Sequence, residues 1–200
     1  MKFAESWRRG GEILVALLFA TAAFAQTAEP TWLDRPLSNW NKAATTLPRA
    51  VPNGETLADM MKRCADMQTL RNTPGERALA DAGWLPFHLF DRQMMQRDVE
   101  IVGGLAGADG MCRPVDFNVF VFVAGRFAGM LSPGDMSSRN DGSVGAIRLA
   151  EDDTIAAEFA RYAESDPLCC PSGRVTVRYR IDRKAVPPVV VPVSVQATRP

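Results

Sequence analysis

The 200-residue chain has a formal net charge of zero, from 23 basic and 23 acidic side chains, and 46% of its residues are hydrophobic. This balance gives no electrostatic reason to expect a nucleic-acid partner. The hydrophobic fraction is that of a folded domain rather than a disordered chain. The length is sufficient to bury one hydrophobic core, and we expect a single domain.

The first 25 residues have the pattern of a secretory signal peptide. Lys2, Arg8 and Arg9 form a positive region ahead of a short apolar run, Ile13–Phe24, which is too short to span a bilayer comfortably. The Ala-Phe-Ala site that follows predicts cleavage after Ala25. No cysteine lies near this point to accept a lipid, so we expect a periplasmic or secreted protein with no transmembrane segment after cleavage.

Residues 26–52 are rich in proline, threonine and alanine and show no sustained period. We interpret them as an extended arm that lies on the domain, because indole rings such as those of Trp32 and Trp40 seldom decorate a solvated tail. The domain itself is expected to span residues 53–200.

Two helices are predicted at the start of this domain. Apolar residues recur at three- and four-residue intervals over Glu55–Leu70, which predicts an amphipathic helix with Cys64 on its buried side. The methionines of this stripe are better explained by core packing than by ligand binding. Thr73-Pro74-Gly75-Glu76 has the form of a capping box with proline at the first helical position, and Gly83 is expected to end that helix.

The rest of the chain alternates as β-strands do. Residues 103–110 carry four glycines without a dinucleotide-binding pattern, and we expect a loop there. The segment Val115–Val123 is apolar on both faces, which is typical of a central strand, and Pro192 confines the last strand to an edge. Short turns join consecutive strands, which indicates antiparallel pairing. The expected strands are 98–102, 115–123, 127–131, 146–150, 154–162, 174–182 and 189–195.

The predicted fold class is therefore α+β: a single disulfide-linked domain, mainly an antiparallel sheet of about five to six strands with one or two N-terminal helices packed on it. Four cysteines in an exported chain indicate two disulfides, and they allow three connectivities. We expect Cys64 and Cys112 each to pair with one member of the adjacent pair Cys169 and Cys170, because neighbouring side chains in extended backbone point to opposite faces. Which cysteine takes which partner stays open.

Three segments carry a family resemblance. They are Asp109–Pro114, the hairpin around Phe120–Val123 and Gly125, and the adjacent-cysteine segment Asp166–Pro171. Together they resemble the LppP/LprE family of exported bacterial proteins, and looser similarity includes Trp40-Asn41 and Ala82–Trp84. The resemblance implies an extracytoplasmic location and no established biochemical activity, so it supplies no catalytic residues. This chain departs from the lipoproteins of the family because it has no lipobox cysteine.

The leading functional hypothesis is a non-enzymatic envelope module that binds a partner protein or a small acidic ligand. Arg174, Arg178 and Arg180 alternate with apolar residues along one predicted strand and would form an exposed ladder able to meet carboxylates. An ordinary charged sheet face is the alternative explanation. No cofactor or metal is expected.

Other candidate groups are explained more simply by structure. A lone histidine, His88, is more often a packed residue than a ligand. Cys169-Cys170 suggests a thiol redox protein, but a dithiol enzyme usually has a C-x-x-C pair at a helix start. Glu151, Asp152 and Asp153 could serve a hydrolase, although adjacent acidic residues on a turn point in different directions. Turn chemistry explains the remaining acidic and amide side chains better than calcium binding does; these are Asp135, Asn140 and Asp141.

Overall fold

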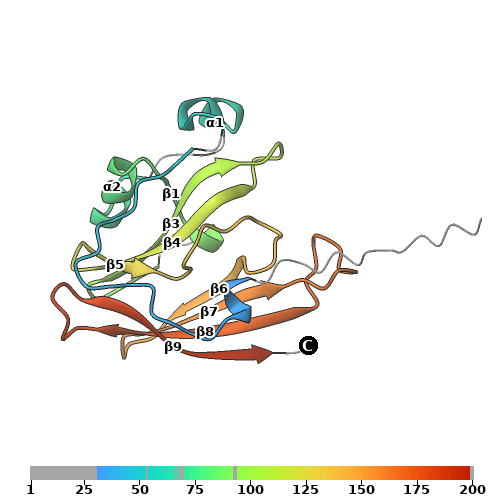
Figure 1. Cartoon of the computed structure of the whole chain (residues 1–200). Helices are drawn as coiled ribbons and strands as arrows, with labels where there is room; N and C mark the ends of the chain where they lie inside the picture. Colours follow the sequence, from blue (N-terminus) through green and yellow to red (C-terminus); the bar gives the residue numbers. More distant parts are fainter. Residues whose placement is uncertain (1–30, 53, 66, 68–69, 92–93, 199–200) are drawn as a thin grey trace, which may run out of the picture.

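The structure is a computed structural model, and it describes residues 31–52, 54–65, 67, 70–91 and 94–198. The predicted signal peptide lies outside these residues. In the described chain, strands form two antiparallel sheets and two α-helices lie beside the first of them (Figure 1). The first sheet has the order β1-β3-β4-β5, with β2 also paired to β3, and the second has the order β6-β7-β8-β9.

The helices are α1 Leu57–Arg63 and α2 Pro74–Asp81, with short 3-10 turns at Trp32–Asp34 and Leu89–Asp91. The strands of the first sheet are β1 Leu85–Phe87, β2 Met94–Gln96, β3 Val99–Ala108, β4 Pro114–Val123 and β5 Arg126–Met130. The strands of the second sheet are β6 Val144–Leu149, β7 Thr154–Arg161, β8 Gly173–Asp182 and β9 Val189–Thr198.

The predicted α+β class with mainly antiparallel strands is confirmed, but the strands divide into two sheets instead of one. The reason lies in β4, which is apolar on both faces. Val119 and Val121 face the second sheet in the main core, while Phe120 and Phe122 face the other way. Because both faces of β4 must be covered, α2 packs on one side and the second sheet packs on the other.

The predicted capping box of α2 is confirmed. The Thr73 side chain accepts a hydrogen bond from the Glu76 backbone nitrogen, and the Glu76 carboxylate accepts one from the Thr73 backbone nitrogen. Pro74 occupies the first turn, and Gly83 has φ +90° directly after the helix ends, which is the conformation that glycine adopts most easily.

The other predicted helix is shorter than expected. Instead of running over Glu55–Leu70, α1 ends at Arg63, and Cys64 caps it with φ −108° and ψ 70°. The backbone leaves helical geometry where Cys64 turns to join Cys112. The methionines of this segment pack in the core, as predicted. Met60 is 1% exposed, and Met61 and Met67 are partly buried against the same core.

The predicted glycine-rich loop is wrong, because Gly103, Gly104 and Gly107 lie inside β3. Glycine is needed at Gly103 and Gly104 because aromatic rings take the space of a side chain. A Cβ atom on Gly103 would lie 2.5 Å from the ring of Phe87, and one on Gly104 would lie 2.7 Å from the ring of Phe120. The strand therefore uses glycines for close packing and not for a turn.

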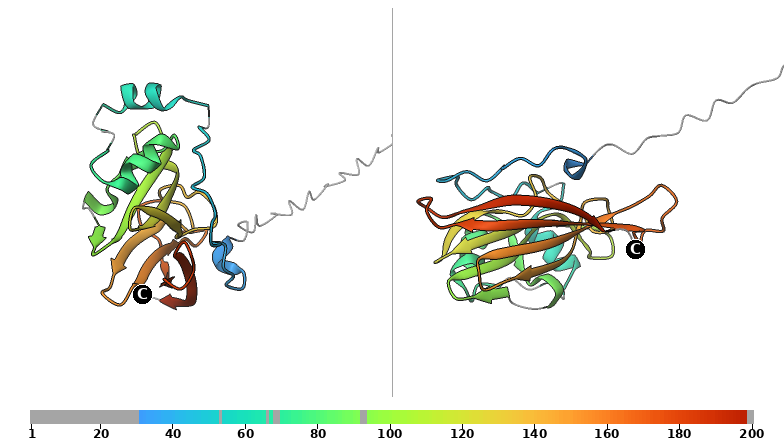
Figure 2. Two further views of the ribbon diagram at one scale, coloured as in Figure 1. Left: turned by 90° about the vertical axis from the view of Figure 1, so that its left-hand side faces the viewer. Right: turned by 90° about the horizontal axis from the view of Figure 1, so that it is seen from below.

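Residues 31–52 run along the side of the domain and contact both sheets (Figure 2). The indole Nε1 of Trp40 donates to the carbonyl of Met130 at 3.0 Å. Asn41 is 5% exposed and donates through Nδ2 to the carbonyls of Met130 at 2.9 Å and Val190 at 3.0 Å. Trp32 packs edge-on against Phe159 of β7. The arm thereby links the edge strand of each sheet.

The predicted disulfide pairing is also wrong. Cys64 is bonded to Cys112, and Cys169 is bonded to Cys170. Cys64 at the end of α1 lies beside the turn between β3 and β4, which holds Cys112, whereas Cys169 and Cys170 lie in the turn between β7 and β8. The two turns belong to different sheets, so the predicted links between them do not form.

Candidate functional site

The three predicted arginines lie on the outer face of the second sheet. Along β8 the side chains of Val175, Val177, Tyr179 and Ile181 are buried in the core, and the residues between them point outward. Arg174, Arg178 and Arg180 are therefore all exposed, as the alternation predicts.

The strand register adds a fourth arginine, which the sequence reasoning missed. Arg178 pairs with Ala156 on β7, and Ala156 pairs with Arg148 on β6. Arg148 is exposed, while its neighbour Ile147 is 1% exposed. That local alternation could have marked Arg148 as outward-facing, but only the register places it in the same row as Arg178. We call Arg148, Arg174, Arg178 and Arg180 the basic face.

The spacing of the basic face follows from sheet geometry. Alternate residues of a strand lie roughly 7 Å apart, so Arg174 and Arg178 are separated by about 13 Å. Arg148 and Arg178 lie two strands apart, at about 10 Å. Ala156 stands between them with only a methyl group, which leaves the space between the two guanidinium groups open along that row.

The basic face is only partly neutralised. Arg180 has Asp182 within 4.0 Å. Among the described residues, no carboxylate forms an ion pair with Arg148, Arg174 or Arg178. Glu158 lies on the same face, half-buried and opposite Ala146 and Thr176. Both helices lie beyond the first sheet (Figures 1 and 2), and no described helix covers the basic face.

The structure gives His88 a partner in the helix cap. His88 Nε2 lies 2.9 Å from Oε1 of Glu76, whose side chain is completely buried. The other oxygen of Glu76 accepts hydrogen bonds from the backbone nitrogens of Asn72 at 2.6 Å and Thr73 at 3.1 Å. This carboxylate therefore organises the start of α2. In the described ranges, no group of three or more histidine, cysteine, aspartate or glutamate residues is arranged to hold a metal ion.

The acidic turn between β6 and β7 is occupied by ion pairs. Hydrogen bonds from Arg183, and further ones from Arg97, hold the pKa of Asp153 down at about 2. Asp152 accepts a hydrogen bond from the backbone nitrogen of Thr154 at 3.1 Å. These contacts of Asp152 and Asp153 stabilise the turn.

The three residues weighed for calcium are separated in the loop after β5. Asp141 accepts from Nε of Arg161 at 3.1 Å and from the backbone nitrogen of Tyr162 at 2.8 Å. Asp135 lies 3.4 Å from the amide of Asn118. Asn140 is exposed, and its backbone nitrogen donates to the Ser137 carbonyl. Only the Asn140 contact is that of a turn; the side chains of Asp135 and Asp141 instead bind residues that are distant in the sequence.

The turn that carries Cys169 and Cys170 is exposed. Asp166 closes it, because its Oδ2 accepts from the backbone nitrogens of Ala163 at 2.7 Å and Ser172 at 2.8 Å. Those backbone hydrogen bonds, that of Ser172 first, lower the pKa of Asp166.

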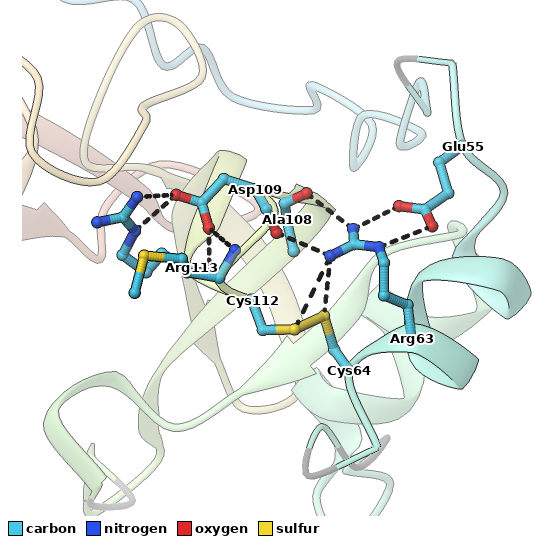
Figure 3. The surroundings of a disulfide bond; sticks show 8 residues. Glu55, Arg63, Cys64, Ala108, Asp109, Cys112 and Arg113 are labelled. Atoms are coloured by element: carbon cyan, nitrogen blue, oxygen red, sulfur yellow. Dashed lines mark hydrogen bonds and ion pairs between the residues drawn. A yellow bond between two sulfur atoms is a disulfide. The ribbon is translucent and has the colours of Figure 1, made fainter.

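The Cys64–Cys112 disulfide has a charged neighbour (Figure 3). Nη1 of Arg63 lies 3.4 Å from Sγ of Cys64 and 3.8 Å from Sγ of Cys112. Its Nη2 lies 2.6 Å from Oε2 of Glu55. Arg63 precedes Cys64 in the chain, but no sequence pattern predicts that its side chain folds back over both sulfur atoms.

The protein is thus an α+β protein of two antiparallel sheets with an exposed basic face. None of the helices in the described chain is long and apolar enough to cross a membrane. Residues 99–184 match the family model of the LppP/LprE lipoproteins, a segment that begins with β3 and ends just after β8. This match confirms the resemblance to the LppP/LprE family. No curated protein and no solved structure matches the chain significantly.

Proposed function

We propose that the protein is an exported, non-enzymatic binding module of the bacterial cell envelope, and that its basic face takes a carboxylate-bearing polymer. The observation that carries this proposal is a sheet face with three exposed arginines, Arg148, Arg174 and Arg178, for which the described part of the chain supplies neither an ion-pair partner nor a covering helix. The lipoprotein family match fits an exported protein.

The chemistry of arginine favours carboxylates. A guanidinium group presents two parallel N–H donors that match the two oxygens of a carboxylate. A sheet face is flat, and the arginines are spread over roughly 7 to 13 Å, so one small anion could not reach them all. A chain with repeated carboxylates could contact several at once, and the combined contacts would strengthen weak single ones.

The proposal is tested with a polyuronate such as polygalacturonate. We expect the full chain to bind it, to bind neutral dextran much more weakly, and to lose affinity as salt rises, because screening acts over about 8 Å at physiological ionic strength. The triple variant Arg148→Gln, Arg174→Gln and Arg178→Gln should bind the polyuronate at least about tenfold more weakly, since each charged hydrogen bond contributes about 1.5 kcal/mol or more.

A matched control removes the same charge elsewhere. Arg49, Arg126 and Arg139 are exposed, and no ion pair with another described residue is found for them. The control variant Arg49→Gln, Arg126→Gln and Arg139→Gln should bind like the original chain. Equal losses in both triple variants would contradict the proposal, as would tighter binding of inorganic polyphosphate than of polyuronate. Circular dichroism would verify that both variants are folded.

The location is part of the proposal. We expect a periplasmic or secreted protein whose signal peptide is removed after Ala25, so that the exported chain begins with Gln26. Intact mass spectrometry of the protein recovered from an expressing bacterium measures this directly. A mass that includes Met1, or one that includes a lipid at the N-terminus, would overturn the expectation.

A further inference from the structure

Arg63 holds a fixed position over the Cys64–Cys112 disulfide. Glu55 binds its Nε at 3.1 Å and its Nη2 at 2.6 Å. The carbonyls of Ala108 and Asp109, at the end of β3, accept from Nη2 at 3.0 Å and from Nη1 at 2.8 Å. With four oxygen contacts from two directions, the guanidinium group cannot swing away from the sulfur atoms without breaking several bonds (Figure 3).

The two sulfur atoms differ in their surroundings. Cys64 is 3% exposed and caps the C-terminal end of α1. Cys112 is half-buried in the β3–β4 turn, next to Met111, which is 74% exposed. A surface hollow of about 480 Å³ adjoins the disulfide and is lined by Arg63, Cys64, Ala65, Met67 and Cys112. A thiol arriving from solvent therefore reaches Cys112 more easily than Cys64.

We propose that the Cys64–Cys112 disulfide is a thiol–disulfide exchange site whose reaction partner is an external dithiol, with Cys112 attacked and Cys64 released. The proposal is independent of the basic face, because it concerns a different end of the first sheet.

The external dithiol reduces the Cys64–Cys112 disulfide in two steps. A thiolate of the dithiol bonds to Sγ of Cys112, and the Sγ–Sγ bond breaks with its electron pair moving to Cys64. The second thiol of the reagent loses its proton and then attacks the reagent's first sulfur atom, the one bonded to Sγ of Cys112. This step releases Cys112 as a thiolate. The reagent becomes a disulfide, the protein gains two electrons, and the two protons of the reagent end on Cys64 and Cys112 by way of solvent.

Arg63 supplies what the leaving sulfur needs. The end of a helix disfavours a negative charge because its free carbonyl groups point there, so a Cys64 thiolate would be a poor leaving group without help. Nη1 of Arg63, at 3.4 Å, can donate a charge-assisted hydrogen bond to that thiolate. Asp109 also lies nearby, but it is paired with Arg113, whose hydrogen bonds lower the pKa of Asp109 to about 2.

Reduction would change how α1 is held. The disulfide joins the end of α1 to the β3–β4 turn across 48 residues of sequence, and α1 sits at the far end of the molecule from the second sheet (Figures 1 and 2). Opening the bond would leave Arg63, the buried side chain of Met60 and partly buried apolar side chains as the links between α1 and the domain. The exchange site therefore controls how firmly α1 is attached.

The direction of attack is tested with glutathione under native conditions. A short exposure followed by alkylation with N-ethylmaleimide and peptide mapping should place glutathione on Cys112 and the alkyl group on Cys64. Mapping also separates these products from those of Cys169 and Cys170. Glutathione mainly on Cys64 would overturn the proposal. A rate that stops rising with thiol concentration would do so as well, since it would mean that reduction waits for unfolding.

The role of Arg63 is tested with dithiothreitol. Arg63→Gln should slow reduction of the Cys64–Cys112 bond about tenfold, as expected for losing one hydrogen bond to a charged group. Arg63→Lys should recover part of the rate, because it keeps the charge. Arg126→Gln is the matched control, since it removes one exposed positive charge at the β4–β5 turn and leaves the β3–β4 turn with Cys112 unchanged. Its rate of reduction should equal that of the original chain. An Arg63→Gln rate equal to or faster than the original would show that Arg63 only anchors the turn.

Discussion

Arg183 and Asp98 form a bidentate ion pair that joins the two sheets. Nη1 of Arg183 lies 2.9 Å from Oδ2 of Asp98, and Nη2 lies 2.8 Å from Oδ1. Asp98 stands directly before β3 in the first sheet, and Arg183 stands directly after β8 in the second. The same guanidinium group also binds Asp153 in the β6–β7 turn, with Nη2 2.9 Å from Oδ1. One side chain therefore ties three segments together.

Replacing this arginine should destabilise the protein. The hydrogen bonds of Arg183 lower the pKa values of both Asp98 and Asp153, the latter to about 2. A carboxyl group whose pKa is lower in the folded state stabilises the fold above its unfolded pKa, and that contribution is lost as the pH falls through the folded pKa. Because Arg183 and Asp98 are over one-third exposed, we expect Arg183→Gln to cost only about 1 kcal/mol at pH 7.

Urea unfolding at several pH values measures this prediction. Between about pH 4 and pH 2, the original chain should lose stability more steeply than Arg183→Gln, so the two curves should approach each other. Arg49→Gln, which removes an exposed arginine from the arm, should follow the original curve. Parallel curves for Arg183→Gln and the original chain would refute the linkage.

The two disulfides should differ greatly in their contributions to stability. Loss of the Cys64–Cys112 bond, through Cys64→Ala with Cys112→Ala, should cost roughly 4 kcal/mol, because a long loop becomes free in the unfolded chain. Loss of the bond between the neighbouring Cys169 and Cys170 frees almost no loop and should cost less than about 1 kcal/mol. Urea unfolding of the two double variants measures both losses of stability. Similar losses would contradict the observed pairing and favour disulfides from Cys64 and Cys112 to Cys169 and Cys170.

The glycines of β3 should not tolerate a methyl group. A Cβ atom on Gly104 would come within 2.7 Å of the ring of Phe120 and 3.3 Å of Cβ of Trp84, both of which are buried. We expect Gly104→Ala to lower stability by about 1 to 2 kcal/mol through overpacking. Gly134→Ala is the control, because no atom lies within 4 Å of the Cβ that it would add. Its stability, measured by thermal unfolding, should lie within about 0.5 kcal/mol of that of the original chain.

Asn41 should be the main attachment point of the arm. Besides donating to two carbonyls, its Oδ1 accepts a hydrogen bond from the backbone nitrogen of Met130 at 2.9 Å. Asn41→Ala removes three hydrogen bonds. The Met130 carbonyl keeps the indole of Trp40, but the Val190 carbonyl and the Met130 backbone nitrogen lose their bonds to Asn41, so we expect a loss of about 2 kcal/mol. Limited proteolysis should then cut residues 42–52 faster. The control Asn140→Ala, at an exposed position, should change neither stability nor the rate of proteolysis. If residues 42–52 of Asn41→Ala resist the protease as well as those of the original chain, Asn41 does not have this role.

Features that depend on neighbouring residues were predictable from the chain alone. The capping box at Thr73 and Glu76 works within one helical turn, and the outward direction of Arg174, Arg178 and Arg180 follows from alternation along one strand. The pairing of β3 with β4, of β4 with β5 and of β6 with β7 follows from the short turns that join them. The segments that resemble the LppP/LprE family are likewise contiguous motifs. The family match covers the three main ones, between residues 99 and 184, whereas Trp40-Asn41 and Ala82–Trp84 lie outside it.

Tertiary structure decided what depends on distant residues. The role of Gly103 and Gly104 is set by the rings of Phe87 and Phe120, so composition alone made a strand look like a loop. Arg148 joins the basic face only through the register of three strands. The disulfide pairing depends on which turns lie at the same end of which sheet, and Arg63 meets both sulfur atoms only because α1 stops beside Cys112. Local rules set the direction of a side chain, but its partners come from packing.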